Sequence, residues 1–203
     1  MSLVLAMCLF ALSMSISPGP VNLICLSTGV NHGPRRALPF VSGATIGFSL
    51  LLALIGLGIG ALAEHQRLLD LLGLAGAGFI GYIGIRIATA DPRLETVSAR
   101  RPGFGEGFLL QWLNPKAWIA CLSGVSAFNL AGDYPQLALF VALYFVICYA
   151  SIASWALIGG RMGALIATPR KLQIFNRLMG GALVLVAGYL LVVEMITGTG
   201  VTA

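Results

Sequence analysis

The chain has 203 residues, of which 58% are hydrophobic and only 9% are charged, and its mean hydropathy is +0.94. A soluble domain carries about 25% charged residues, so this composition excludes an ordinary water-soluble enzyme. A membrane span needs about 20 mainly apolar residues, and the chain is almost filled by six such runs. We therefore expect an all-α integral membrane protein with a single transmembrane domain, residues 1–203.

The apolar runs follow one another along the chain, separated by short polar segments rich in turn-forming residues. The first run begins without the positively charged region of a cleaved signal peptide, so we expect it to be a retained span. The predicted spans cover about 3–28, 37–62, 68–88, 106–128, 136–160 and 178–196.

Arginine and lysine are distributed unevenly between the predicted connections. The connections at 29–36, 91–105 and 161–177 carry most of them, whereas the connections after the second and fourth spans carry only Arg67. Positive residues remain on the cytoplasmic side, so both termini are predicted outside, with 91–105 as a cytoplasmic linker. The net charge of +5 is thus attributed to loops, and the basic–aromatic pattern of a nucleic-acid surface is missing.

Two proline motifs interrupt the first and fourth apolar runs near their middles. A proline inside a helix removes a backbone donor and clashes with the carbonyl four residues earlier, here those of Met14, Ile16 and Gln111. In hydrocarbon such a break is tolerated only where protein or a water-filled cavity surrounds it. Helices 1 and 4 are therefore predicted to be broken near the membrane midplane, facing the interior. The two motifs are Ser17-Pro18-Gly19-Pro20 and Asn114-Pro115-Lys116.

Both motifs also have the pattern of a helix beginning. Ser17 and Asn114 are good N-cap residues, and a proline follows each at the first helical position. A helix that begins inside the membrane directs free N–H groups and a positive dipole end into the protein, which suits a carboxylate. A pair of simple proline kinks is the alternative interpretation.

Lys116 is the only charged side chain predicted near a midplane. Its position costs about 2.5–3.5 kcal/mol on insertion scales, so it needs either the carbonyls released by the proline breaks or a solute carboxylate. Asn22 shares a helical face with Ser15, and Gln111 shares one with Asn114. Interhelical hydrogen bonding is the alternative role for Asn22 and Gln111. The predicted substrate-binding residues are Ser17, Pro18, Gly19, Pro20, Asn22, Gln111, Asn114, Pro115 and Lys116.

The order of the motifs predicts an internal repeat. Ser17-Pro18 corresponds to Asn114-Pro115, and Cys25-Leu26-Ser27 corresponds to Cys121-Leu122-Ser123. Three spans in each half would invert the second half relative to the first. We therefore expect two inverted three-helix repeats, about 1–90 and 106–203. Interrupted helices at corresponding positions of such halves indicate a transport site with alternating access.

Two other functions remain open at this point. Cys25 and Cys121 lie at nearly equivalent places, which suits a membrane thiol electron carrier, although both lie more than a helical turn beyond the breaks. Export of another small solute or a metal ion is the second; a metal would need carboxylates, histidines or thiolates where the chain has Lys116. The sequence holds no Walker motif, hydrolase nucleophile pattern or metal-ligand cluster, so neither an enzyme nor a cofactor is predicted.

Five features share the pattern of one known family: 17–22, 31–37, Gly43 with Gly47, 81–85 and 107–117. Together they resemble the lysine exporter (LysE/RhtB) family over nearly the whole chain. That resemblance implies a small exporter of amino acids or close derivatives in the bacterial cytoplasmic (inner) membrane, driven by the proton gradient, and it is compatible with a homo-oligomer. One departure from the family pattern is Val21, where family members often carry Asp or Asn. Another is 123–126, which lacks the usual Pro-Gln pattern, so the substrate is expected to differ from those of the best-known family members.

Overall fold

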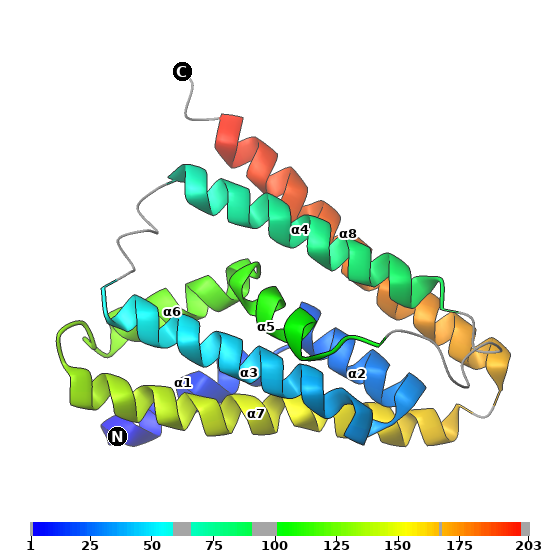
Figure 1. The fold of residues 1–203 in the computed structure, drawn as a ribbon, viewed down its shortest axis with the longest axis horizontal. Coiled ribbons are helices and arrows are strands. Elements are labelled where there is room, and N and C mark those ends of the chain that lie inside the picture. Colours follow the sequence, from blue (N-terminus) through cyan, green and yellow to red (C-terminus); the bar gives the residue numbers. More distant parts are fainter. Residues whose placement is uncertain (1, 59–65, 91–100, 167, 200–203) are drawn as a thin grey trace.

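The computed structural model describes the backbone of residues 2–58, 66–90, 101–166 and 168–199, and the side chains of 2–58, 71–90, 101–166 and 168–193. All regular structure in these residues is helical (Figure 1). The helices are α1 (Leu3–Ile16), α2 (Pro20–His32), α3 (Pro34–Gly56), α4 (Gln66–Ala88), α5 (Phe104–Trp112), α6 (Pro115–Ala127), α7 (Tyr134–Leu165) and α8 (Pro169–Thr199).

Both proline motifs break their helices. α1 ends at Ile16 and α2 begins at Pro20, with an angle of 61° between them, and α5 ends at Trp112 before α6 begins at Pro115. The prediction that Ser17 is the N-cap of the helix that follows the first break was wrong. Ser17 is the C-cap of α1, and Gly19 is the N-cap of α2, with Pro20 at the first helical position. Ser17 and Gly19 each precede a proline and are both extended, as steric clash with the proline ring requires, so the helix restarts only after the second proline.

Four of the described helices are long and apolar enough to cross a membrane: Pro34–Gly56, Leu71–Ala88, Tyr134–Leu165 and Pro169–Val193. α1 and α2 satisfy the same criteria together as one bent pair. α5 and α6 are each short, and the polar residues Gln111, Asn114 and Lys116 lie around their junction. The structure therefore supports up to five of the predicted spans, and the α5–α6 span stays a prediction.

The connections are shorter than the sequence predicts. The predicted loop 29–36 is helical except for Gly33, which joins α2 to α3 at φ +82°, a conformation that favours glycine. Much of the basic segment 161–177 is also helical, because α7 continues to Leu165 and α8 begins at Pro169, and arginine and lysine are good helix formers. Residues 91–100, which make up most of the predicted linker, lie outside the described residues.

The helices form two groups. α4 and α8 lie side by side, and the other helices pack together beside them (Figure 1). Asn31 of α2 and Asn176 of α8 join the groups through paired side-chain amides, with donor–acceptor distances of 2.7 and 3.0 Å. Asn176 is fully buried, so this polar pair compensates a desolvation that would otherwise be costly.

Close helix contacts depend on glycine, as the spacing of Gly43 and Gly47 suggests. A Cβ added at Gly43 would meet the backbone carbonyl of Phe104, and one at Gly107 would meet that of Phe40, so α3 and α5 touch along their backbones. α2 and α7 approach equally closely at Gly29. These contacts hold both broken helices against continuous ones, which fixes the position of each break.

Candidate functional site

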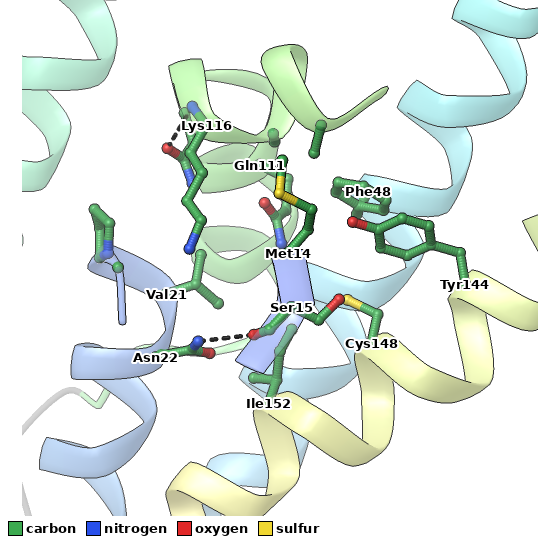
Figure 2. Close-up of a pocket in the computed structure, with 15 residues that line it drawn as sticks. Met14, Ser15, Val21, Asn22, Phe48, Gln111, Lys116, Tyr144, Cys148 and Ile152 are labelled. Carbon is green, nitrogen blue, oxygen red and sulfur yellow. Dashed lines mark hydrogen bonds between the residues drawn. The ribbon is translucent and has the colours of Figure 1, made fainter. Parts of the chain in front are cut away.

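A small cavity of about 50 Å³ lies between the two broken helices (Figure 2). The end of α1, the start of α2, and α5 and α6 surround it, and α3 and α7 close the opposite side. Residues of both proline breaks therefore line one cavity, Gly19 from the first and Asn114 from the second, whereas Pro18 is exposed. Six of the nine predicted site residues line the cavity: Gly19, Pro20, Asn22, Gln111, Asn114 and Lys116.

The ammonium group of Lys116 binds the first break. Its Nζ donates to the Ser17 hydroxyl at 2.7 Å, to the Ser17 carbonyl at 3.0 Å and to the Pro18 carbonyl at 3.4 Å. Gly19 leaves room for this contact, because a Cβ there would stand 3.3 Å from Nζ. Ser17 and Pro18 thus take part in the site through Lys116. The lysine binds backbone carbonyls, as one of its two predicted roles required, but these are the carbonyls of the break itself and not those of Met14, Ile16 or Gln111.

Asn22 holds the same break from the other side and is 4% exposed. Its Nδ2 donates to the carbonyls of Ser15, at 2.9 Å, and of Ser17, at 2.8 Å. Because carbonyls only accept, the amide has one acceptable orientation, which turns Oδ1 away from them. Among the residues that the structure describes, Asn22 Oδ1 has no hydrogen-bond partner, and neither has the Ser15 hydroxyl. The cavity therefore contains a buried acceptor suited to a donor group.

The carbonyls that the prolines leave without helical donors have found other partners. The Ser17 hydroxyl donates to Met14 O at 3.1 Å, and the indole of Trp155 on α7 donates to Ile16 O at 3.1 Å. At the second break Asn114 N approaches Gln111 O at 3.4 Å. Side chains thus supply much of the bonding that a membrane break needs from its surroundings.

The two helix beginnings differ in what they offer a ligand. Asn114 caps α6 as predicted: its side-chain oxygen accepts from the backbone N–H of Lys116 at 3.2 Å, and Pro115 takes the first helical position. In the part of the chain that the structure describes, no side chain caps the start of α2. Since 19–22 line the cavity, α2 is the helix whose positive dipole end is available to an anion there.

The far wall of the cavity was not predicted from the sequence. Phe48 of α3 stacks on Tyr144 of α7 with ring centroids 4.4 Å apart, and Cys148 and Ile152 continue the wall (Figure 2). Tyr144 and Cys148 are four residues apart and so share one helical face, a weak polar signal inside an apolar run. This wall is mostly apolar, with one hydroxyl and one thiol.

Cys25 and Cys121, the residues of the thiol-carrier alternative, lie away from this cavity. Both thiols are free and both side chains are fully buried. A thiol that exchanges electrons with a partner has to be reached by it. Neither side chain is accessible in this conformation.

Comparison with known proteins agrees with the resemblance described above. The chain is 26% identical over 186 residues to a homoserine/homoserine lactone efflux protein of Salmonella typhimurium, covering 87% of this chain and 90% of that protein. It is 30% identical over 130 residues to a cysteine/O-acetylserine efflux protein of Klebsiella pneumoniae, covering 64% of this chain and 66% of that protein. No solved structure matches the chain.

A family model described as LysE type translocator matches residues 12–194, a range that contains both proline motifs and every residue of the cavity. Most of the chain, including its candidate site, is therefore accounted for by one family. The chain belongs to the LysE type translocators.

Proposed function

We propose that this protein exports small amino acids or close derivatives across the bacterial cytoplasmic membrane, and that the solute binds at the break between α1 and α2. The observation that carries this proposal is the pairing of opposite polarities at that break: the uncapped start of α2 lines the cavity, and Lys116, which also lines it, binds the carbonyls of Ser17 and Pro18 at the end of α1. The names of the relatives, which are efflux proteins for homoserine and for cysteine derivatives, support the same solute class.

A zwitterion fits this arrangement. Half-helix N-termini suit anionic groups, and half-helix C-terminal ends suit cations. The solute carboxylate is assigned to the start of α2, around Val21 and Asn22. The solute ammonium is assigned to the carbonyls of Ser17 and Pro18, with Asn22 Oδ1 as the nearby free acceptor. The largely apolar wall at Phe48 and Tyr144 would then receive a small side chain.

The cavity is too small for an amino acid in the conformation described here. About 50 Å³ has room for a few water molecules, whereas ligand pockets are commonly about 300 Å³ or larger. Solute binding therefore needs an opening of the site and a displacement of the Lys116 side chain. Rocking of one half of the protein against the other would supply the opening, as alternating access requires.

The helix pairing supports the inverted-repeat arrangement of about 1–90 and 106–203. The broken helix of each half packs on the second helix of the other half: α1 and α2 pack on α7, and α5 and α6 pack on α3. The third helices, α4 and α8, pack on each other, and so do the second helices, α3 and α7. Two halves related by a two-fold axis would make these contacts. In this arrangement α5 and α6 together form the fourth of the six spans in chain order.

The proposed orientation has both termini outside. The end of α2, the start of α3, the end of α7 and the start of α8 lie at one end of the molecule (Figure 1), and they carry Arg35, Arg36, Arg161, Arg170 and Lys171. Contacts of Gly160 with Pro34 and of Gly163 with Val30 hold this end together. Clustered positive charge favours the cytoplasm for this end and the outside for the start of α1.

Export itself is tested by comparing the metabolites released by cells with and without the overproduced protein. We expect one or a few small amino acids to accumulate outside, and resistance to a toxic analogue to rise. Lys116→Ala should abolish export against a concentration gradient while the protein still inserts in the membrane at normal levels. Unchanged release, pools and resistance across all common amino acids and homoserine would refute the proposal.

A further inference from the structure

We infer that the oxygens at the α1–α2 break form a binding site for one primary ammonium group, filled by Lys116 in the empty protein and by the solute's own ammonium during transport, so that Lys116 carries the coupled proton. This inference rests on the proposed function and deepens it. It assigns the coupling of export to one side chain and to three named oxygens.

The ligand set matches an ammonium group. Lys116 Nζ has three N–H donors, and it faces three oxygen acceptors: the Ser17 hydroxyl and the carbonyls of Ser17 and Pro18. All three acceptors are neutral, so the set is suited to a single positive charge and does not depend on a paired carboxylate. The ammonium of an α-amino acid presents the same three donors and is chemically the same group.

The site cannot hold both ammonium groups. Nζ already contacts all three oxygens, and a Cβ on Gly19 would stand only 3.3 Å from it, so little space remains beside the lysine. Two like charges on the same oxygens would also repel each other at such short range. Binding of a solute ammonium at these oxygens therefore requires Lys116 to leave them.

A displaced Lys116 finds no oppositely charged protein side chain among the residues that line the cavity. The residues that line the cavity come from both breaks and from α1, α2, α3, α5, α6 and α7. In the described part of the chain, Tyr144 and Cys148 of α7 are the other titratable side chains among them. No carboxylate, histidine or arginine is in this lining. An ammonium without its oxygens is the costly form in such surroundings, whereas a neutral amine is not.

The resulting cycle balances in charge and atoms. On the cytoplasmic side the zwitterion binds, the Lys116 ammonium becomes an amine, and one proton passes to cytoplasmic water. After the solute leaves on the outer side, the amine takes one proton from outside and the ammonium returns to the Ser17 and Pro18 oxygens. One proton thus enters for each zwitterion exported, with no other reactant.

The first test measures protons on the purified wild-type protein in weakly buffered detergent solution with a pH indicator dye. Adding L-homoserine should release about one proton per binding site, because binding and deprotonation are linked. 4-Hydroxybutyrate, which keeps the carboxylate and hydroxyl but lacks the ammonium, should release none. Binding of homoserine without proton release would overturn the inference, whatever any variant does.

The second test uses protein reconstituted in lipid vesicles. Lys116→Gln should keep exchange of labelled homoserine for unlabelled homoserine across the vesicle membrane but lose all accumulation driven by a pH gradient. Lys116→Arg, which stays charged, should lose both activities. Lys171→Gln changes the other lysine of the chain, exposed on α8, and should behave as wild type in both assays.

Three results would contradict the assignment. A folded Lys116→Gln protein that still accumulates solute on a pH gradient would remove Lys116 from coupling. A folded Lys116→Gln protein that loses exchange as well would make the lysine a solute ligand. Absence of exchange by the wild type across all amino acids tested would refute the proposed function first, and this inference with it.

Discussion

The ammonium nitrogen of Lys116 lies 2.7 Å from the hydroxyl oxygen of Ser17, although 99 residues separate the two in the chain. This contact joins the start of α6 to the end of α1, and so joins one helix break to the other. Each break alone would leave polar backbone groups without partners in an apolar environment. The two breaks are therefore interdependent, and a change at one should be felt at the other.

Restoring the backbone donors at the first break should abolish transport. In Pro18→Ala/Pro20→Ala the new N–H groups can donate to Met14 O and Ile16 O, so α1 can continue into α2. We expect the export rate to fall at least about tenfold, which corresponds to roughly 1.4 kcal/mol of solute-binding free energy, while the thermal midpoint does not fall. Export from cells and thermal unfolding in detergent measure the two quantities.

Pro39→Ala is the control, because Pro39 is inside α3 on an exposed face away from the cavity, and the variant should export normally. Normal export by the double variant would contradict a role for the break.

Replacing Asn22 should destabilise the fold. Asn22→Leu removes both donors from the carbonyls of Ser15 and Ser17 and leaves polar atoms buried, at a cost of about 1–3 kcal/mol each. A loss of about 2 kcal/mol would lower the melting temperature by at least about 4 °C for a chain of this size. Ser13→Ala, which removes an exposed hydroxyl bonded within α1, should change stability by less than about 0.5 kcal/mol. Equal melting temperatures for Asn22→Leu and wild type would show that this amide does not hold the break.

Two glycines of α5 should respond in opposite ways to the same substitution. Gly107→Ala directs a methyl group into the backbone of Phe40 on α3, and overpacking of this kind costs about 1–3 kcal/mol. Gly105→Ala meets open space and should stabilise the helix by about 0.5–1 kcal/mol. Thermal unfolding of the two purified variants measures the difference, and similar midpoints would be inconsistent with backbone contact between α3 and α5.

Reporter fusions test the orientation of the chain. Because most positive residues gather at one end, alkaline phosphatase fused after Gly132 or after Ala203 should be exported and active. Green fluorescent protein fused after Pro102 or after Thr168 should remain in the cytoplasm and fluoresce. The opposite pattern at all four positions would invert the proposed topology and therefore the direction assigned to proton movement.

The sequence predicts the fold best where the covalent structure of a residue restricts the backbone next to it. The missing N–H groups of Pro18, Pro20 and Pro115 are sufficient to predict both breaks, and the need of Lys116 for released carbonyls follows from the cost of its charge. The error at Ser17 was also local, because the rule that a residue before proline is extended applies to both Ser17 and Gly19.

The failures depend on distant partners. Asn31 and Gly33 have the composition of a loop, yet Asn31 remains in α2 because its amide pairs with Asn176, 145 residues away. The Tyr144 wall was missed because an aromatic residue in an apolar run gives no sign of which face meets a cavity. The Trp155 indole that donates to Ile16 O is likewise invisible until α7 is placed beside the break.

The single-residue link at Gly33 has a mechanical consequence. Only Gly33, at φ +82°, lies between α2 and α3, so the connection between these two helices is too short to let them move far apart. A rotation of α2 should therefore move α3 as well. The backbone contacts between α3 and α5 should then transmit the motion to α5. The hinge for this motion is therefore left to residues 17–19, which are not helical and of which Gly19 lines the cavity.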